Sequence, residues 1–140
     1  MMEIDGGCLC GDVTWRARID PGKVGVCHCT DCQINSATAF RWAVMVPAAD
    51  FELLSGELKV YVKTAESGNP RALSFCPRCG TSIHGGDVEN SKTYSLRLGN
   101  CNQRAELPPK GQIWCRSAMP WVDHLGEIRK ISEQGRPPPR

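Results

Sequence analysis

The chain has 140 residues, a formal charge of +2 and 23% charged side chains. A chain of this length predicts one domain with a modest hydrophobic core. It contains no apolar run long enough to span a membrane, and its first residues lack the basic and apolar regions of a secretory signal. We therefore expect a cytoplasmic protein without a membrane partner. The nearly balanced charge and the absence of a basic tract argue against a nucleic-acid partner.

In chain order, the predicted elements are mainly β-strands. Alternation of Val13, Trp15, Ala17 and Ile19 with polar residues predicts a strand with one apolar face. A short strand over 24–28 follows a turn and leads into a helix over 31–37, which Thr30 can cap. Further strands are expected over 40–46, 51–54, 58–62, 71–75, 94–98 and 112–115. We expect a single domain over residues 1–130 and a disordered tail over 131–140, which is rich in proline and polar residues.

Cysteine is the most informative residue type. Seven of the nine cysteines form three clusters: Cys8 and Cys10; Cys27, Cys29 and Cys32; Cys76 and Cys79. The run from Cys76 through Pro77 and Cys79 to Gly80 is typical of a zinc knuckle, because proline stiffens the turn and glycine allows the backbone twist. Seven thiols fit a closed four-thiolate structural site and a three-thiolate site with one free position.

The placement of the clusters supports two sites. Cys8 and Cys10 come just before the first predicted strand, where alternate residues of an extended chain face the same side. Pairing them with the knuckle would pin the N-terminus to the middle of the sheet. The middle cluster is local enough to wrap a metal alone. Seven thiolates around two Zn²⁺ ions would change the formal charge to about −1.

Two other uses of the cysteines fit less well. A disulfide framework would leave one of nine thiols unpaired, and no secretory signal directs the chain to an oxidising compartment. A redox pair at Cys76 and Cys79 requires a βαβ context and a following helix, whereas the sequence after the motif is extended and rich in glycine.

The ordered motifs Gly7 to Gly11, Cys27 to Cys32 and Phe75 to Thr81 carry a family resemblance. Together with Val46-Pro47 and Trp121, they resemble the glutathione-dependent formaldehyde-activating enzyme family, which includes the centromere-protein-V group. The resemblance covers residues 6 to about 125. It implies a β-rich, twisted Mss4-like fold with one or two short helices. It also implies a structural zinc held by Cys8, Cys10, Cys76 and Cys79, and a second, more labile and catalytic zinc held by Cys27, Cys29 and Cys32.

The activity that this resemblance implies is that of a zinc-dependent carbon–sulfur lyase. The substrate would be an adduct of glutathione, or another thiol, with formaldehyde or a small aldehyde, as in S-hydroxymethylglutathione synthase. Glutathione is anionic, so a cationic anchor is expected. Arg41, Arg97 and Arg116 lie near the motifs, although strand arginines are usually solvated. Gln33 replaces a residue that is usually basic in the family, which predicts weak glutathione affinity or a preference for another thiol.

Three other functions remain open. The first is a non-catalytic, zinc-stabilised module that binds a protein. The second is an enzyme similar to methionine sulfoxide reductase B that uses Cys115 as its nucleophile. The third is a nucleic-acid-associated protein, which the charge disfavours. Two further residues are assigned structural roles: His28 lies between two ligands on the opposite face of an extended segment, and Cys101 is expected to be a small buried residue.

Overall fold

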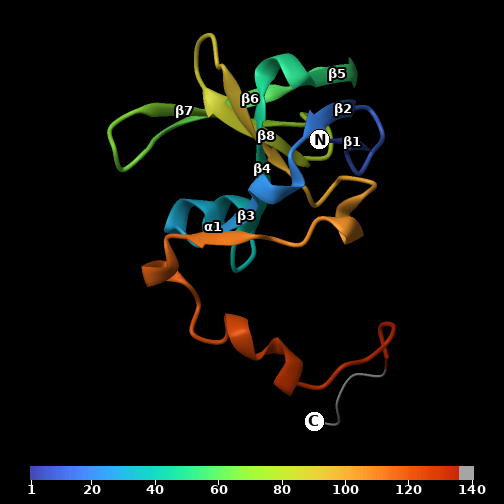
Figure 1. Cartoon of the computed structure of the whole chain (residues 1–140), viewed down its shortest axis with the longest axis vertical. Coiled ribbons are helices and arrows are strands. Elements are labelled where there is room, and N and C mark those ends of the chain that lie inside the picture. Colours follow the sequence, from blue (N-terminus) through green and yellow to red (C-terminus); the bar gives the residue numbers. More distant parts are fainter. Residues whose placement is uncertain (136–140) are drawn as a thin grey trace.

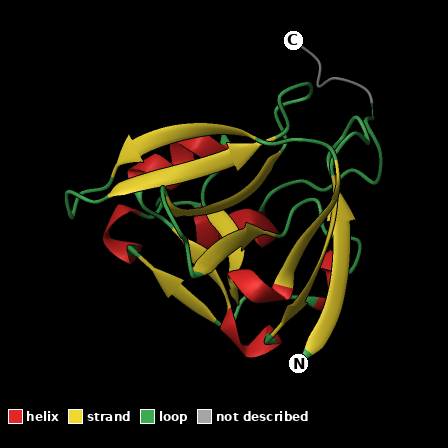
Figure 2. Cartoon of the chain, turned by 90° about the horizontal axis from the view of Figure 1, so that it is seen from above, coloured by secondary structure: helices red, strands yellow, loops and turns green. Residues whose placement is uncertain are grey.

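The computed structural model describes residues 1–135 and confirms a mainly β fold built from two sheets (Figures 1 and 2). The smaller sheet is antiparallel, in the order β1-β2-β5. The larger sheet has the order β10-β3-β4-β9-β8-β7-β6, and only the β10–β3 pair is parallel. The strands are β1 Met2–Gly7, β2 Thr14–Ile19, β3 Val24–Cys27, β4 Arg41–Pro47, β5 Phe51–Ser55, β6 Lys59–Thr64, β7 Pro70–Phe75, β8 Ser82–Asp87, β9 Thr93–Arg97 and β10 Gly111–Ile113.

One hydrophobic cluster joins the two sheets. Trp15 and Ile19 of β2 are fully buried with Val44 of β4, Ile83 of β8 and Leu96 of β9. Burial of each such aliphatic side chain contributes roughly 1.5–3 kcal/mol. The alternation in β2 that predicts an apolar face is confirmed, because its buried and exposed residues alternate along the strand.

The sequence does not predict β1. Ile4 is its only buried large apolar side chain, and its last two residues are glycines, which are depleted in strands. Gly6 is required there, because a Cβ at this position would lie 2.5 Å from the ring of Trp15. The seven strands predicted between residues 13 and 98 are found within two residues of the expected ends. The strand expected over 112–115 instead ends at Ile113.

The α-helix α1, Thr30–Ser36, lies where a helix is predicted, but its cap differs. Cys29, not Thr30, is the N-cap, and its sulfur accepts a hydrogen bond from the backbone N–H of Cys32. The helix ends at Ser36, and its C-cap residue Ala37 adopts the left-handed conformation with φ 55°. Five 3₁₀ helices were not predicted: η1 Pro21–Lys23, η2 Ala48–Asp50, η3 Arg104–Glu106, η4 Cys115–Ser117 and η5 Val122–Glu127.

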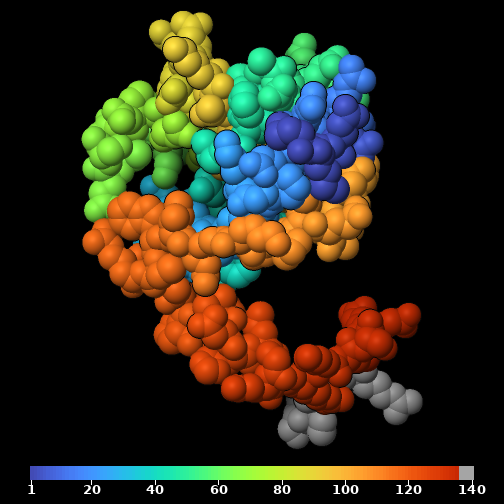
Figure 3. All heavy atoms as spheres, viewed as in Figure 1, coloured from blue at the N-terminus to red at the C-terminus, as the bar shows by residue number. Residues whose placement is uncertain are grey.

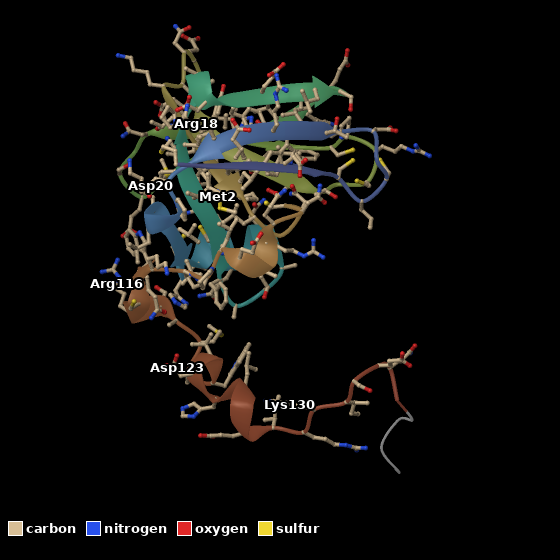
Figure 4. All side chains as sticks on the ribbon, turned by 45° about the vertical axis from the view of Figure 1, so that its right-hand side comes forward. Met2, Arg18, Asp20, Arg116, Asp123 and Lys130 are labelled. Carbon is tan, nitrogen blue, oxygen red and sulfur yellow. The ribbon has the colours of Figure 1, made fainter. Side chains whose placement is uncertain are left out.

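After η4 the chain extends away from the sheets (Figures 1 and 3). Arg116 lies at the base of this segment, whereas Asp123 and Lys130 lie along it (Figure 4). Within residues 1–135, no helix combines the length and the apolar character needed to cross a membrane. Of the tail expected over 131–140, residues 136–140 lie outside the described part of the chain.

Candidate metal centres and active-site cleft

Four cysteines from two distant segments meet at one point. Cys8 and Cys10 lie in the turn between β1 and β2, and Cys76 and Cys79 lie between β7 and β8. The sulfurs of Cys8 and Cys10 are 3.5 Å apart, and those of Cys10 and Cys76 are 3.8 Å apart. Four sulfurs placed tetrahedrally at ~2.3 Å from a zinc ion lie about 3.8 Å from one another. These separations fit zinc ligands and are far too long for disulfides.

The expectation that Cys8 and Cys10 lie in extended chain is wrong. They occupy a tight turn, in which Gly11 has φ +87°. In this turn the backbone N–H of Val13 donates to the Cys8 sulfur at 3.2 Å. The turn therefore directs both sulfurs inward by backbone conformation instead of by strand alternation.

Thr81 links this turn to the knuckle. The backbone N–H of Leu9 donates to its hydroxyl oxygen at 3.1 Å, and the hydroxyl lies 3.2 Å from the Cys79 sulfur. The side chain and then the backbone N–H of Thr81 are the main causes that lower the pKa of the Cys79 thiol to about 5. Gly80 has φ +79°, the conformation expected of the glycine in the knuckle. The donor set fits a closed structural zinc.

The second cluster is built within six residues. Cys27 ends β3, Cys29 caps α1 and Cys32 lies in its first turn, so the three sulfurs lie within 4.8 Å of one another. Among the described His, Cys, Asp and Glu side chains, none adds a fourth donor to this group. Cys27 is buried, whereas Cys29 and Cys32 are partly exposed. Such a set fits a metal that keeps one position open.

All three cysteines line a cleft of about 840 Å³. Burial raises the pKa of the Cys32 thiol to about 12, although the charge of Arg41 opposes this shift. Burial also raises the pKa of Cys29, but hydrogen bonds from Cys32 and Cys27 and the charge of Lys63 lower it overall. A metal ion has to displace the Cys32 proton, so the metal affinity of this cluster falls with decreasing pH.

Five basic side chains line the cleft, and three of them have acidic partners. The ion pairs are Lys63–Asp31 at 2.9 Å, Arg71–Asp87 at 2.8 Å and Arg116–Glu66 at 3.5 Å. Arg41 and Arg97 are the other two, and Arg97 is only 8% exposed. The expectation that these arginines are solvated is therefore wrong for Arg97. Its strand, β9, is central in the sheet, a position that alternation within a single strand does not reveal.

His28, Cys101 and Cys115 belong to neither cysteine cluster. His28 is buried, and its Nε2 lies 2.8 Å from the Gln112 side-chain oxygen. Cys101 is buried in the core. Cys115 is exposed and is not among the residues that line the 840 Å³ cleft, so the geometry does not favour the reductase interpretation.

Gln33 does not line this cleft either. Its amide nitrogen donates to the backbone oxygens of His28, at 2.7 Å, and Ser117, at 2.8 Å. It therefore ties α1 to the segment that follows β3 and to η4. The inference of altered glutathione affinity from Gln33 has no direct contact to support it.

Comparison with known proteins supports the fold and the family resemblance. A Schizosaccharomyces pombe protein, named as an uncharacterized lyase, is 27% identical over 96 residues. That match covers 69% of this chain and 66% of the yeast protein, just under two thirds of its length. A crystal structure of a Rhodobacter sphaeroides protein superposes with a TM-score of 0.60 at 19% identity, covering 79% of this chain and 99% of that one. Residues 3–117 match the family described as glutathione-dependent formaldehyde-activating enzyme, and the chain belongs to this family.

Proposed function

We propose that the protein is a zinc-dependent carbon–sulfur lyase. It makes and breaks the adduct of a thiol, such as glutathione, with formaldehyde or a small aldehyde. The observation that carries the proposal is the contrast between the two clusters. One has four cysteine donors, and the other has three donors in the wall of a cleft of about 840 Å³. A closed site stabilises a fold, whereas an open site beside a cleft accommodates a substrate.

In the adduct-forming direction, the thiol sulfur forms a bond to the carbonyl carbon. The carbonyl π electrons move to oxygen, and that oxygen takes up a proton as the thiol proton is lost. A zinc ion held by Cys27, Cys29 and Cys32 would favour the thiolate form of the substrate at neutral pH. The carbon–sulfur bond breaks by the reverse of these steps.

The residues of the cleft contribute position and charge. The ion pair of Lys63 with Asp31 links β6 to α1 beside the cluster, which holds two walls of the cleft together. The Lys63 charge lowers the pKa of Cys29 and so favours its thiolate. Arg41 and Arg97 add positive charge where an anionic thiol enters.

The test is the rate of exchange, because an enzyme does not change the equilibrium yield of a reaction that already proceeds without it. NMR exchange spectroscopy follows exchange between glutathione plus formaldehyde and the hydroxymethyl adduct. Zinc-replete protein should accelerate exchange, Cys29→Ser should not, and Cys115→Ser should act as wild type. No acceleration with glutathione, cysteine or other small thiols would favour the non-catalytic binding module.

A further inference from the structure

The cleft face of the larger sheet brings two arginines next to the three-cysteine cluster. Arg41 lies directly opposite Cys27 in the β3–β4 pair, and Arg97 lies opposite Ala43 in the β4–β9 pair. Residues that face each other across strands, and residues two apart in one strand, share a face of the sheet. One face of the sheet therefore carries Cys27, Arg41, Ala43 and Arg97.

Gly85 leaves room for the Arg97 side chain to lie over the sheet. A Cβ at Gly85 would lie 2.9 Å from a terminal nitrogen of Arg97, so glycine permits this placement. The Nη1 atom of Arg97 donates to the backbone oxygen of Ser95 at 3.0 Å and to its hydroxyl oxygen at 2.8 Å. Both acceptors are uncharged. They orient the guanidinium without neutralising it.

Arg41 and Arg97 also differ from the other cations of the cleft in having no carboxylate within ion-pair distance among residues 1–135. The Nε of Arg41 is buried and has no acceptor in that part of the chain. Burial first, and then the charge of Arg41, lower the pKa of Arg97 to about 9. A buried guanidinium beside a second, partly exposed one, with no carboxylate partner for either among the described residues, is costly to a fold, so the arrangement calls for an anion.

A second cleft indicates what kind of anion fits. Arg41 and Arg97 line this cleft of about 660 Å³ as well as the first, so they stand between the two. Arg104, Asn35, Asn100 and Asn102 add hydrogen-bonding groups to its lining, which includes no aspartate or glutamate. Its volume is typical of sites for small molecules. Because its lining has arginines and no carboxylates, this cleft suits an anion of the size of a short peptide better than a neutral molecule.

We propose that Arg41 and Arg97 form a carboxylate-binding subsite, which selects thiols that carry a carboxylate, with the body of the thiol extending into the second cleft. The identity of the ligand as a thiol rests on the proposed function. The competing explanation is that the two arginines only balance the negative charge of three thiolates. The two explanations differ in whether a carboxylate on the ligand affects binding.

S-Methylglutathione tests binding apart from catalysis, because its sulfur is methylated and cannot add to an aldehyde. Isothermal titration of zinc-replete protein compares it with its dimethyl ester, which lacks both carboxylates. Wild type should bind the acid at least about tenfold more tightly than the ester, because only the acid has a carboxylate that can accept charge-assisted hydrogen bonds from arginine. Arg41→Gln and Arg97→Gln should each lose most of this preference. Arg97→Lys, which keeps the charge but not the planar fork, should restore it only in part.

Arg71→Gln is the matched control, because Arg71 lines the first cleft but already pairs with Asp87. It removes the same charge and should keep the preference for the acid. If Arg97→Gln does not fold, the partly exposed Arg41 still provides the test.

Equal binding of acid and ester by wild type, or no binding of either, would overturn the subsite. So would a loss of zinc in Arg97→Gln with the acid preference unchanged. Preference for the acid without any acceleration of adduct exchange would keep the subsite and reject the lyase proposal.

Discussion

The sulfur of Cys10 lies 3.8 Å from the sulfur of Cys76, although 66 positions separate the two residues. This contact ties the β1–β2 turn to the β7–β8 turn, and so links the small sheet to the large one. The entropy cost of closing a loop grows slowly with its length, so one metal can hold such distant segments. We expect the four-cysteine site to supply a large share of the stability of the fold.

Cys79→Ser should lower the free energy of unfolding by more than about 3 kcal/mol. That is a small part of the roughly 10–16 kcal/mol that structural zinc supplies in small zinc domains. Chemical unfolding and zinc analysis of the purified variant measure the effect. Cys115→Ser, at an exposed thiol outside both clusters, is the control and should match wild type. A Cys79→Ser protein with wild-type stability and zinc content would disprove the structural assignment.

Cys29→Ser should remove the second metal without unfolding the chain. Serine is also a good N-cap, so the first turn of α1 keeps an acceptor for the Cys32 N–H. We expect zinc content to fall by about one ion per chain with little change in melting temperature. In wild type, mild chelation should remove this ion before the one at the closed site. Unchanged zinc content in metal-replete Cys29→Ser would rule out the three-cysteine site.

The cysteine clusters could be predicted because their information is local. Three ligands within six residues need only a strand end, a cap and one helical turn, and this geometry is found. The pairing of Cys8 and Cys10 with Cys76 and Cys79 could not be predicted from spacing, because nothing in the spacing selects residues almost seventy positions away. The family resemblance supplied that pairing. The donor geometry now supports it.

The features that the sequence does not predict share one physical cause: each depends on contacts between segments that are distant in the chain. β1 has a weak apolar pattern and is held by pairing along the whole of β2. Arg97 is buried because its strand is central, and Gln33 forms contacts with residues as distant as Ser117. A pattern read along one strand shows which residues share a face. It does not show which face is covered or by what.

Gly6→Ala tests the packing of β1 against the core. The added methyl would lie 2.5 Å from the ring of the fully buried Trp15, so either the ring or the strand has to move. Overpacking of this kind costs about 1–3 kcal/mol in the free energy of unfolding. Gly99→Ala is the matched control, because an added Cβ there has no neighbour within 4 Å, and it should change stability by less than about 0.5 kcal/mol. Equal urea midpoints for the two variants would contradict the packing.

His84 should make the fold less stable in mild acid. It stacks on Tyr94 with ring centroids 4.0 Å apart, and its Nδ1 is buried without a partner in the described residues. Burial, and then the charge of Arg97, lower its pKa from 6.5 to about 4. Between these values the unfolded chain binds more protons than the folded chain. The stability due to neutral His84 is therefore complete above about pH 6.5 and is lost as the pH falls towards 4, by roughly 3 kcal/mol in total.

His84→Phe isolates this contribution, because phenylalanine retains an aromatic ring and cannot bind a proton. Acid also protonates the cysteine thiolates, but that loss is common to both proteins and cancels in their difference. Urea unfolding at pH 7, 6 and 5 should show the variant gaining on wild type as the pH falls, by roughly 2 kcal/mol at pH 5. His124→Phe, at an exposed histidine near Glu127, should show no comparable gain. Parallel stability curves for wild type and His84→Phe would mean that His84 titrates normally in the folded protein.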